Sequence, residues 1–150
     1  MGSSTGTLTA KNNSFSQFST GITWAGGATI SSNSFSHGYQ AVLLTSSQSP
    51  VITDNTWSDL SGVPFGLNSS SLDFSTITGN TTNGLSSPTF DLNGDSIATS
   101  TTMPALVYQV DQALTVPSGI TLTIDPGAVL KSSGSSLCYS PNYGVAYTNF

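Results

Sequence analysis

A short phrase built around an asparagine recurs four times in the first half of the chain. The copies occupy residues 10–15, 30–35, 52–57 and 77–82. Their central asparagines are 20, 22 and 25 residues apart, at Asn13, Asn33, Asn55 and Asn80. A repeat of this length is typical of a solenoid, in which each copy contributes one coil. No other feature of the sequence constrains the fold as strongly.

Aligning the four copies by column predicts which side chains face inward. The first column is aliphatic, as expected for a buried strand position: Ala10, Ile30, Ile52 and Ile77. Asparagine tolerates left-handed backbone geometry, so we expect it to turn the chain and to hydrogen-bond to its equivalents in neighbouring coils. Two residues later the chain has Phe15, Phe35, Trp57 and Thr82. The three aromatic residues predict an internal stack that Thr82 interrupts.

Each phrase is followed by a second strand candidate. These candidates are residues 21–24, 39–44, 64–67 and 89–92. No segment has the apolar period of a helix. We therefore expect an all-β chain with two short strands and three turns in each coil.

The phrase I-x-x-N-[ST]-[FW] resembles the repeat of right-handed parallel β-helices, over residues 8–97. That repeat occurs in the pectate-lyase-like families and in many secreted surface proteins. A second stretch, LTVPSGITLTIDPGAVLK at residues 114–131, resembles the phrase with which β-helices begin in large extracellular proteins. The resemblance implies a right-handed parallel β-helix (β-solenoid) of about five to seven coils, secreted or on the cell surface.

The change of sequence near residue 98 predicts three parts. Residues 1–97 hold the asparagine-centred coils, and residues 98–104 form a linker or irregular coil. Residues 105–150 form further coils and an aromatic C-terminal tail. No cap helix is evident at either end, so head-to-tail self-association is expected through the open strand edges.

The composition excludes several classes of partner. Ser, Thr and Asn make up 59 of 150 residues, Arg and Glu are absent, and the net charge is −5. The two lysines, Lys11 and Lys131, cannot form the basic face that nucleic acid requires. No apolar run is long enough to span a membrane. The single cysteine, Cys138, excludes an internal disulfide framework and a cysteine-based zinc site.

Catalysis by this fold requires particular residue types. Lyases of the fold need a basic residue to remove a proton, commonly with bound calcium, and this chain has no Arg. Hydrolases need paired carboxylates, for which Asp54 and Asp59, on either side of Trp57, are the candidates. Solvated turn positions explain both aspartates more simply than an acid/base pair does. The composition thus favours a protein without enzymatic activity.

Three further hypotheses concern binding. Asp91, Asn93 and Asp95 place three oxygen donors within five residues, which suits calcium as the one possible cofactor, although a polar turn has the same composition. Trp24 and Tyr39 predict stacking on sugar rings if they are exposed. Thr-x-Thr pairs at residues 7–9, 76–78, 99–101 and 121–123 resemble those of ice-binding β-helices, but they are not in repeat register with one another.

These observations predict an extracellular or cell-surface β-helix with a structural, adhesive or glycan-binding role. A polysaccharide-active enzyme, first a carboxylate-based hydrolase and then a lyase, is the alternative. An ice-binding protein is the second alternative. A polysaccharide or cell-surface glycan is the expected partner.

Overall fold

The computed structural model describes residues 6–83 and 90–132. They form a parallel β-solenoid of about five turns, as the repeat predicts. All strand pairs in these residues are parallel, and the pairs that define the coils join segments one coil apart. Residues 133–150, which include Cys138 and most of the aromatic tail, lie outside the described part.

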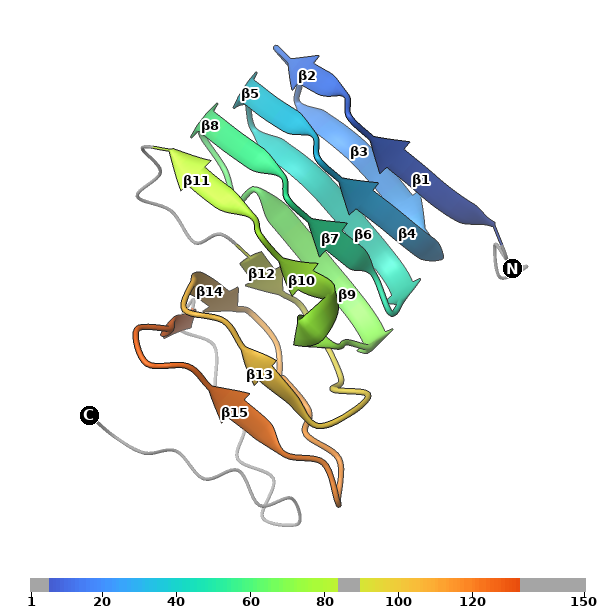
Figure 1. Cartoon of the computed structure of the whole chain (residues 1–150), viewed down its shortest axis with the longest axis vertical. Coiled ribbons are helices and arrows are strands. Elements are labelled where there is room, and N and C mark those ends of the chain that lie inside the picture. The colour runs from blue at the N-terminus through green and yellow to red at the C-terminus, as the bar shows by residue number, and fades with distance from the viewer. Residues whose placement is uncertain (1–5, 84–89, 133–150) are drawn as a thin grey trace.

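Three long sheets run along the solenoid (Figure 1). Sheet A contains β1 (Thr7–Lys11), β4 (Gly27–Ser31), β7 (Val51–Thr53) and β10 (Ile77–Thr78). Sheet B contains β2 (Ser14–Ser16), β5 (Ser34–Gly38), β8 (Thr56–Leu60) and β11 (Thr81–Asn83). Sheet C contains β3 (Thr20–Ala25), β6 (Gln40–Gln48), β9 (Phe65–Ser71), β12 (Phe90–Leu92), β14 (Val107–Val110) and β16 (Val129–Ser132). Sheets A and B lie side by side, and sheet C lies behind them in Figure 1.

The prediction of two strands per coil was wrong, because each regular coil has three. The repeated phrase divides into a sheet A strand and a sheet B strand. The turn between them is made by the residue before the asparagine, with φ values of 58°, 54°, 55° and 67° at Asn12, Ser32, Asp54 and Gly79. The central asparagines have no positive φ, so the expectation that they adopt left-handed geometry was also wrong. Their role in the turn is carried by the side chain.

The central asparagines form a ladder along the corner between sheets A and B. From Asn33 onward, each Oδ1 accepts hydrogen bonds from the backbone N–H and the Nδ2 of the asparagine one coil earlier, at 2.9–3.2 Å. Each Nδ2 from Asn33 onward also donates to the backbone carbonyl of the aliphatic residue one coil earlier, at 2.7–2.9 Å. The amides of Asn33 and Asn55 therefore use all their hydrogen-bonding capacity while buried. The predicted stacking of asparagines is confirmed.

Two aromatic columns fill the interior. Phe15 and Phe35 stack with ring centroids 4.8 Å apart, and Trp57 is paired in register with Phe35 in sheet B. Phe35 and Trp57 are buried, whereas Thr82 is exposed. Sheet C supplies a second column of Phe65, Phe90 and Tyr108. The ring centroids of Phe65 and Phe90 are 5.2 Å apart, and those of Phe90 and Tyr108 are 5.9 Å apart. Each of the second strand candidates predicted from the sequence overlaps a strand of sheet C.

The regular pattern ends after β11. Sheets A and B stop at β10 and β11, while sheet C continues through β12, β14 and β16. A short 3₁₀ helix, η1 (Phe74–Thr76), precedes β10. Below it, β13 (Thr101–Met103) pairs with β15 (Leu122–Ile124) as a separate sheet, so a strand lies within residues 98–104. The division into three parts remains a prediction.

No helix in residues 6–83 and 90–132 has the length and apolar character needed to cross a membrane.

Candidate functional site

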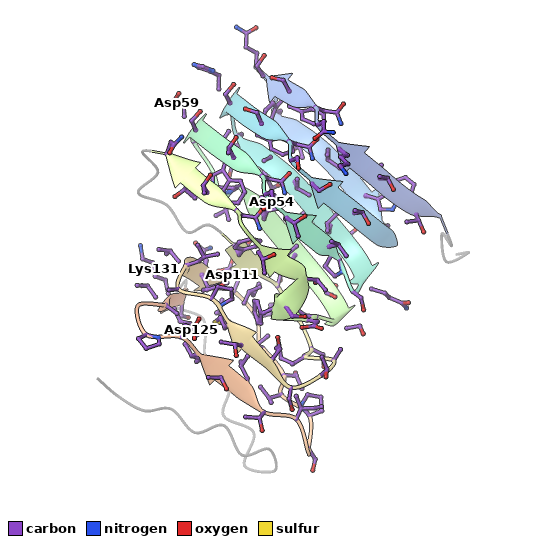
Figure 2. The ribbon with its side chains drawn as sticks, viewed as in Figure 1. Asp54, Asp59, Asp111, Asp125 and Lys131 are labelled. Atoms are coloured by element: carbon purple, nitrogen blue, oxygen red, sulfur yellow. The ribbon has the colours of Figure 1, made fainter. Side chains whose placement is uncertain are left out.

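The two predicted catalytic aspartates are not brought together. Asp54 forms the turn before β8, and Asp59 lies near the end of that strand (Figure 2). Five residues of extended chain separate them by roughly 15 Å. Paired carboxylates of glycoside hydrolases lie about 5–10 Å apart. Asp59 instead faces the exposed His37, with 3.8 Å between Oδ2 and Nε2.

The two predicted sugar-stacking residues have different surroundings. Trp24 is half-buried, packs against the core and donates from Nε1 to the Gly27 carbonyl at 3.1 Å. It is paired in register with the buried Leu44, so its ring faces the interior of the solenoid at the first coil. Tyr39 is 59% exposed, at the turn before β6. The two side chains do not form one aromatic surface, because they lie at opposite ends of their strands.

The predicted calcium cluster of Asp91, Asn93 and Asp95 is divided by the fold. Asp95 is fully buried, and its two carboxylate oxygens accept hydrogen bonds from the backbone N–H groups of Ser69 and Asn93, at 2.7 and 2.8 Å. The bond to Ser69 joins two coils in the same way as a rung of the asparagine ladder. Burial raises the pKa of Asp95 to about 7, against the effect of the two backbone hydrogen bonds. The carboxylate of Asp95 is therefore a structural rung.

Asp91 lies on the outer face of sheet C and has a different acidic neighbour. Its register partners are Gly66 in β9 and Gln109 in β14. Burial, together with the charge and hydrogen bond of Asp111, raises the pKa of Asp91 to about 6. Gln109 Nε2 donates to both carboxylate oxygens of Asp111 at 2.9 Å. Asp91 and Asp111 thus form a coupled acidic pair, in which Asp91 takes up a proton as the pH falls below about 6.

A hollow of about 210 Å³ lies beside Asp91 on sheet C. Its polar lining comes from Asn68, Asp91, Asn93 and Thr45, and its apolar lining from Leu43, Leu44, Gly66 and Leu67. A Cβ atom at Gly66 would lie 2.7 Å from Gln40 Nε2 and 3.0 Å from Leu43 Cδ1, at the flexible ends of these two side chains. An added side chain would therefore shift Gln40 and Leu43, the second of which lines the hollow.

Two residues that line this hollow each carry a buried side-chain acceptor without a donor. Asp91 Oδ1 and Asn93 Oδ1 are buried and have no hydrogen-bond partner among the described residues. The backbone carbonyl of Asn93 is satisfied, since it accepts from Asn68 Nδ2 at 2.6 Å. Buried acceptors normally have a donor, and a missing one suggests a missing ligand or water. The hollow therefore favours a ligand that carries hydrogen-bond donors.

Sequence analysis identified Asp91 and Asn93 but missed Asp111, Gly66 and Asn68. These residues come from coils 18 or more positions away in the chain. The available signal was the register of sheet C, in which Asp91 aligns with Gly66 and with Gln109. That register depends on the lengths of the irregular loops, which the sequence pattern does not specify.

The sequence matches the family model described as "Right handed beta helix region" over residues 1–149. The chain belongs to the right-handed β-helix family. The predicted fold is thereby confirmed, including the hand of the coil. No curated protein and no solved structure matches this chain.

The acidic site of this β-helix differs from a metal centre built from side-chain carboxylates and imidazoles. The described residues hold no group of three or more His, Cys, Asp or Glu side chains placed to bind a metal ion. The site instead combines one carboxylate pair, two amides and the half-buried side chain of Leu43. Such a set can accept hydrogen bonds from a ligand and contact its apolar face.

Proposed function

We propose that this β-helix is a secreted or cell-surface protein that binds glycans at the hollow on sheet C. The single observation that carries the proposal is the pair of buried acceptors, Asp91 Oδ1 and Asn93 Oδ1, that lack donors beside the half-buried side chain of Leu43. Sugar hydroxyls are donors, and the C–H face of a sugar ring contacts aliphatic side chains. A hollow of about 210 Å³ suits a single ring or the end of a chain.

The charge of the site restricts the class of glycan. Asp91 and Asp111 are adjacent acids, and the nearest cation in their register rows is Lys131, beside Gln109 in β16. A uronic acid would bring a third carboxylate toward this pair without a compensating donor. Neutral sugars and amino sugars carry the donors that the site lacks. We therefore expect them to bind in preference to polyuronates.

Binding is favoured over hydrolysis by the geometry of the acids. The carboxyl groups of Asp91 and Asp111 are within hydrogen-bonding reach of each other. In glycoside hydrolases the two carboxyls lie about 5–10 Å apart, with the scissile bond between them. Two carboxyl groups in hydrogen-bonding contact leave no room for a scissile glycosidic bond between them. Retention of a glycan without cleavage is thus the expected behaviour.

The test is a binding screen with cello-, xylo-, chito-, glucosamine and galacturonate oligosaccharides, scored for both retention and cleavage. The affinity for the oligosaccharide that binds is then measured by calorimetry. Asp91→Ala should weaken binding about 10- to 100-fold, because it removes a hydrogen bond to a charged acceptor. Asp59→Ala, an exposed aspartate on sheet B, is the matched control and should bind like the wild type.

Retention of no oligosaccharide, or equal affinity of Asp91→Ala and the wild type, would refute the proposal. Calcium titrated alone tests the other occupant of the hollow. Heat from calcium that Asp91→Ala abolishes would assign the site to the ion. Sedimentation at high protein concentration separately tests the expected head-to-tail association, which a monomer would contradict.

A further inference from the structure

The outer face of sheets A and B carries straight rows of hydroxyl groups. The strand register aligns the rows Thr9–Thr29–Val51, Lys11–Ser31–Thr53–Thr78, Ser14–Ser34–Thr56–Thr81 and Ser16–Ser36–Ser58–Asn83. Except for Lys11, Val51 and Asn83, every position in these rows is Ser or Thr. None of these side chains is buried. We call this surface the hydroxyl face.

The hydroxyls of this face have no hydrogen-bond partners in the part of the chain that the structure describes. Elsewhere in the chain, Ser and Thr hydroxyls do bond locally, as Thr76 Oγ1 does to the carbonyls of Pro50 and Asp73. By contrast, no Ser or Thr in the four rows makes a side-chain hydrogen bond to any other described residue. These hydroxyls are therefore all available to an external partner.

The face is regular in two directions. Neighbouring strands of a sheet are about 4.8 Å apart, and alternate residues of one strand are about 6.6 Å apart. Sheets A and B lie side by side with parallel strands in Figure 1, so their rows run in one direction over both sheets. The Asn ladder fixes the register of successive coils through buried hydrogen bonds. The positions of the hydroxyls are consequently set by the backbone.

Of the Thr-x-Thr pairs noticed in the sequence, only one member of two pairs, Thr9 and Thr78, belongs to this array. Thr7 aligns with Gly27, and Thr101 aligns with Leu122. The array arises instead from Ser and Thr positions that flank the inward residues of each repeat. Because the repeats differ in length, their alignment emerges only from the folded coils.

We propose that the hydroxyl face binds the surface of ice. A partner for this face must offer a two-dimensional lattice of hydrogen-bonding groups. Lys11, in the first coil, is the only ionisable residue in the four rows, and the exposed Asp54 lies at the turn between the second and third rows. The rows contain no aromatic side chain on which a sugar ring would stack, which separates this face from a glycan surface. Ice presents water oxygens in a lattice whose repeats are close to the two spacings above.

The physical advantage of the array is its rigidity. Ordered first-shell waters bridge polar groups at little enthalpic loss, and the cost lies in their immobilisation. Hydroxyls held in rows can immobilise water in positions that continue an ice layer. This inference is independent of the glycan site, which lies on the opposite sheet.

The test is the incorporation of fluorescently labelled protein into a slowly growing ice hemisphere, together with thermal hysteresis. Thr56→Tyr places a bulky ring in the centre of the face, and Thr23→Tyr places the same ring on the outer face of sheet C as a control. Both positions are exposed strand sites. Ser34→Tyr is the replacement if Thr56→Tyr fails to fold, as judged by circular dichroism.

The wild type and Thr23→Tyr should enter the ice and show thermal hysteresis. For Thr56→Tyr, both incorporation and hysteresis should fall to the values measured with buffer alone. Exclusion of the wild type from ice would overturn the proposal. Equal incorporation of Thr56→Tyr and the wild type would also overturn it. A third result would overturn it as well: a wild type that does not bind ice but binds insoluble cellulose or chitin, with that binding abolished by Thr56→Tyr. The partner of the face would then be a polysaccharide surface.

Discussion

The coils before residue 84 and the coils after residue 89 differ in how completely their buried polar groups are hydrogen-bonded. In the first region the asparagines recur at one corner, and each interior amide is satisfied by the coils on either side. In the second region one acidic rung, Asp95, joins two coils, and Asp91 and Asn93 retain acceptors without donors. A buried polar residue that recurs with the coil is thus structural. Polar residues gathered where the repeat lapses remain available to a ligand.

The largest expected effect is the loss of an interior rung of the ladder. Asn55→Ala removes the acceptor of Asn33 N–H and the donor to the Ile30 carbonyl, both of which are buried. We expect the free energy of unfolding to fall by about 3–5 kcal/mol, since each unsatisfied buried group costs about 1–3 kcal/mol. Urea denaturation measures the change.

Asn13→Ala is the control for that experiment. Asn13 is exposed at the open end of the ladder and supports no earlier described coil. Its replacement should cost clearly less than that of Asn55. Equal losses for the two variants would show that the ladder is not a cooperative array of buried bonds.

The acidic rung predicts an unusual dependence of stability on pH. The pKa of Asp95 is raised in the folded state to about 7, so the folded protein binds more protons than the unfolded chain between about pH 4 and 7. The free energy of unfolding should therefore fall as the pH rises through this range, by roughly 2–3 kcal/mol. Asp91, with its pKa raised to about 6, acts in the same direction.

Urea unfolding at pH 5 and pH 8 measures this difference, and Asp95→Asn should remove most of it. The asparagine ladder carries no titratable group and contributes nothing to the slope. A protein that is more stable at pH 8 than at pH 5 would contradict the assignment of Asp95 as a buried, weakly acidic rung.

Glycan binding should depend on the ionisation of Asp91. Protonation removes an acceptor from the hollow, and the pKa of Asp91 is about 6 in the free protein. The affinity for a neutral oligosaccharide should then fall up to about tenfold for each pH unit below 6. Calorimetry between pH 4.5 and 7.5 tests this, and a flat profile would remove Asp91 from the binding surface.

The smallest effect tests whether the repeat can be extended. Thr82 is aligned with Trp57 in the inward aromatic column but is exposed. Thr82→Phe should stabilise the protein by about 0.5–1 kcal/mol through stacking on Trp57. The midpoint of urea unfolding reports the gain. A loss of stability would mean that the column ends at Trp57 for a steric reason.

The sequence predicted the elements that depend on the repeat. Ile30, Asn33 and Phe35 could be assigned to the interior, the corner and the aromatic stack because their columns recur. The third strand of each coil was missed, since left-handed residues as different as Ser32 and Gly79 make the turn and share no side-chain chemistry.

The candidate site could be predicted only in part, because its residues come from different coils. Asp91 and Asn93 were visible as neighbours in the sequence. Their separation from the carboxylate of Asp95 could not be predicted, because it depends on which residue faces inward after Leu92. The approach of Asp111 could not be predicted either, because it depends on the path of the segment between β12 and β14, which includes β13.

The most direct test of the central claim is a titration of the ¹⁵N-labelled protein with glucosamine oligosaccharides, followed by backbone amide shifts. If recognition occurs where the repeat lapses, the shifts should cluster at Gly66, Asn68, Asp91 and Asn93 and should vanish in Asp91→Ala. Shifts centred on the coils of Asn33 and Asn55, or no shifts at saturating ligand, would contradict the claim.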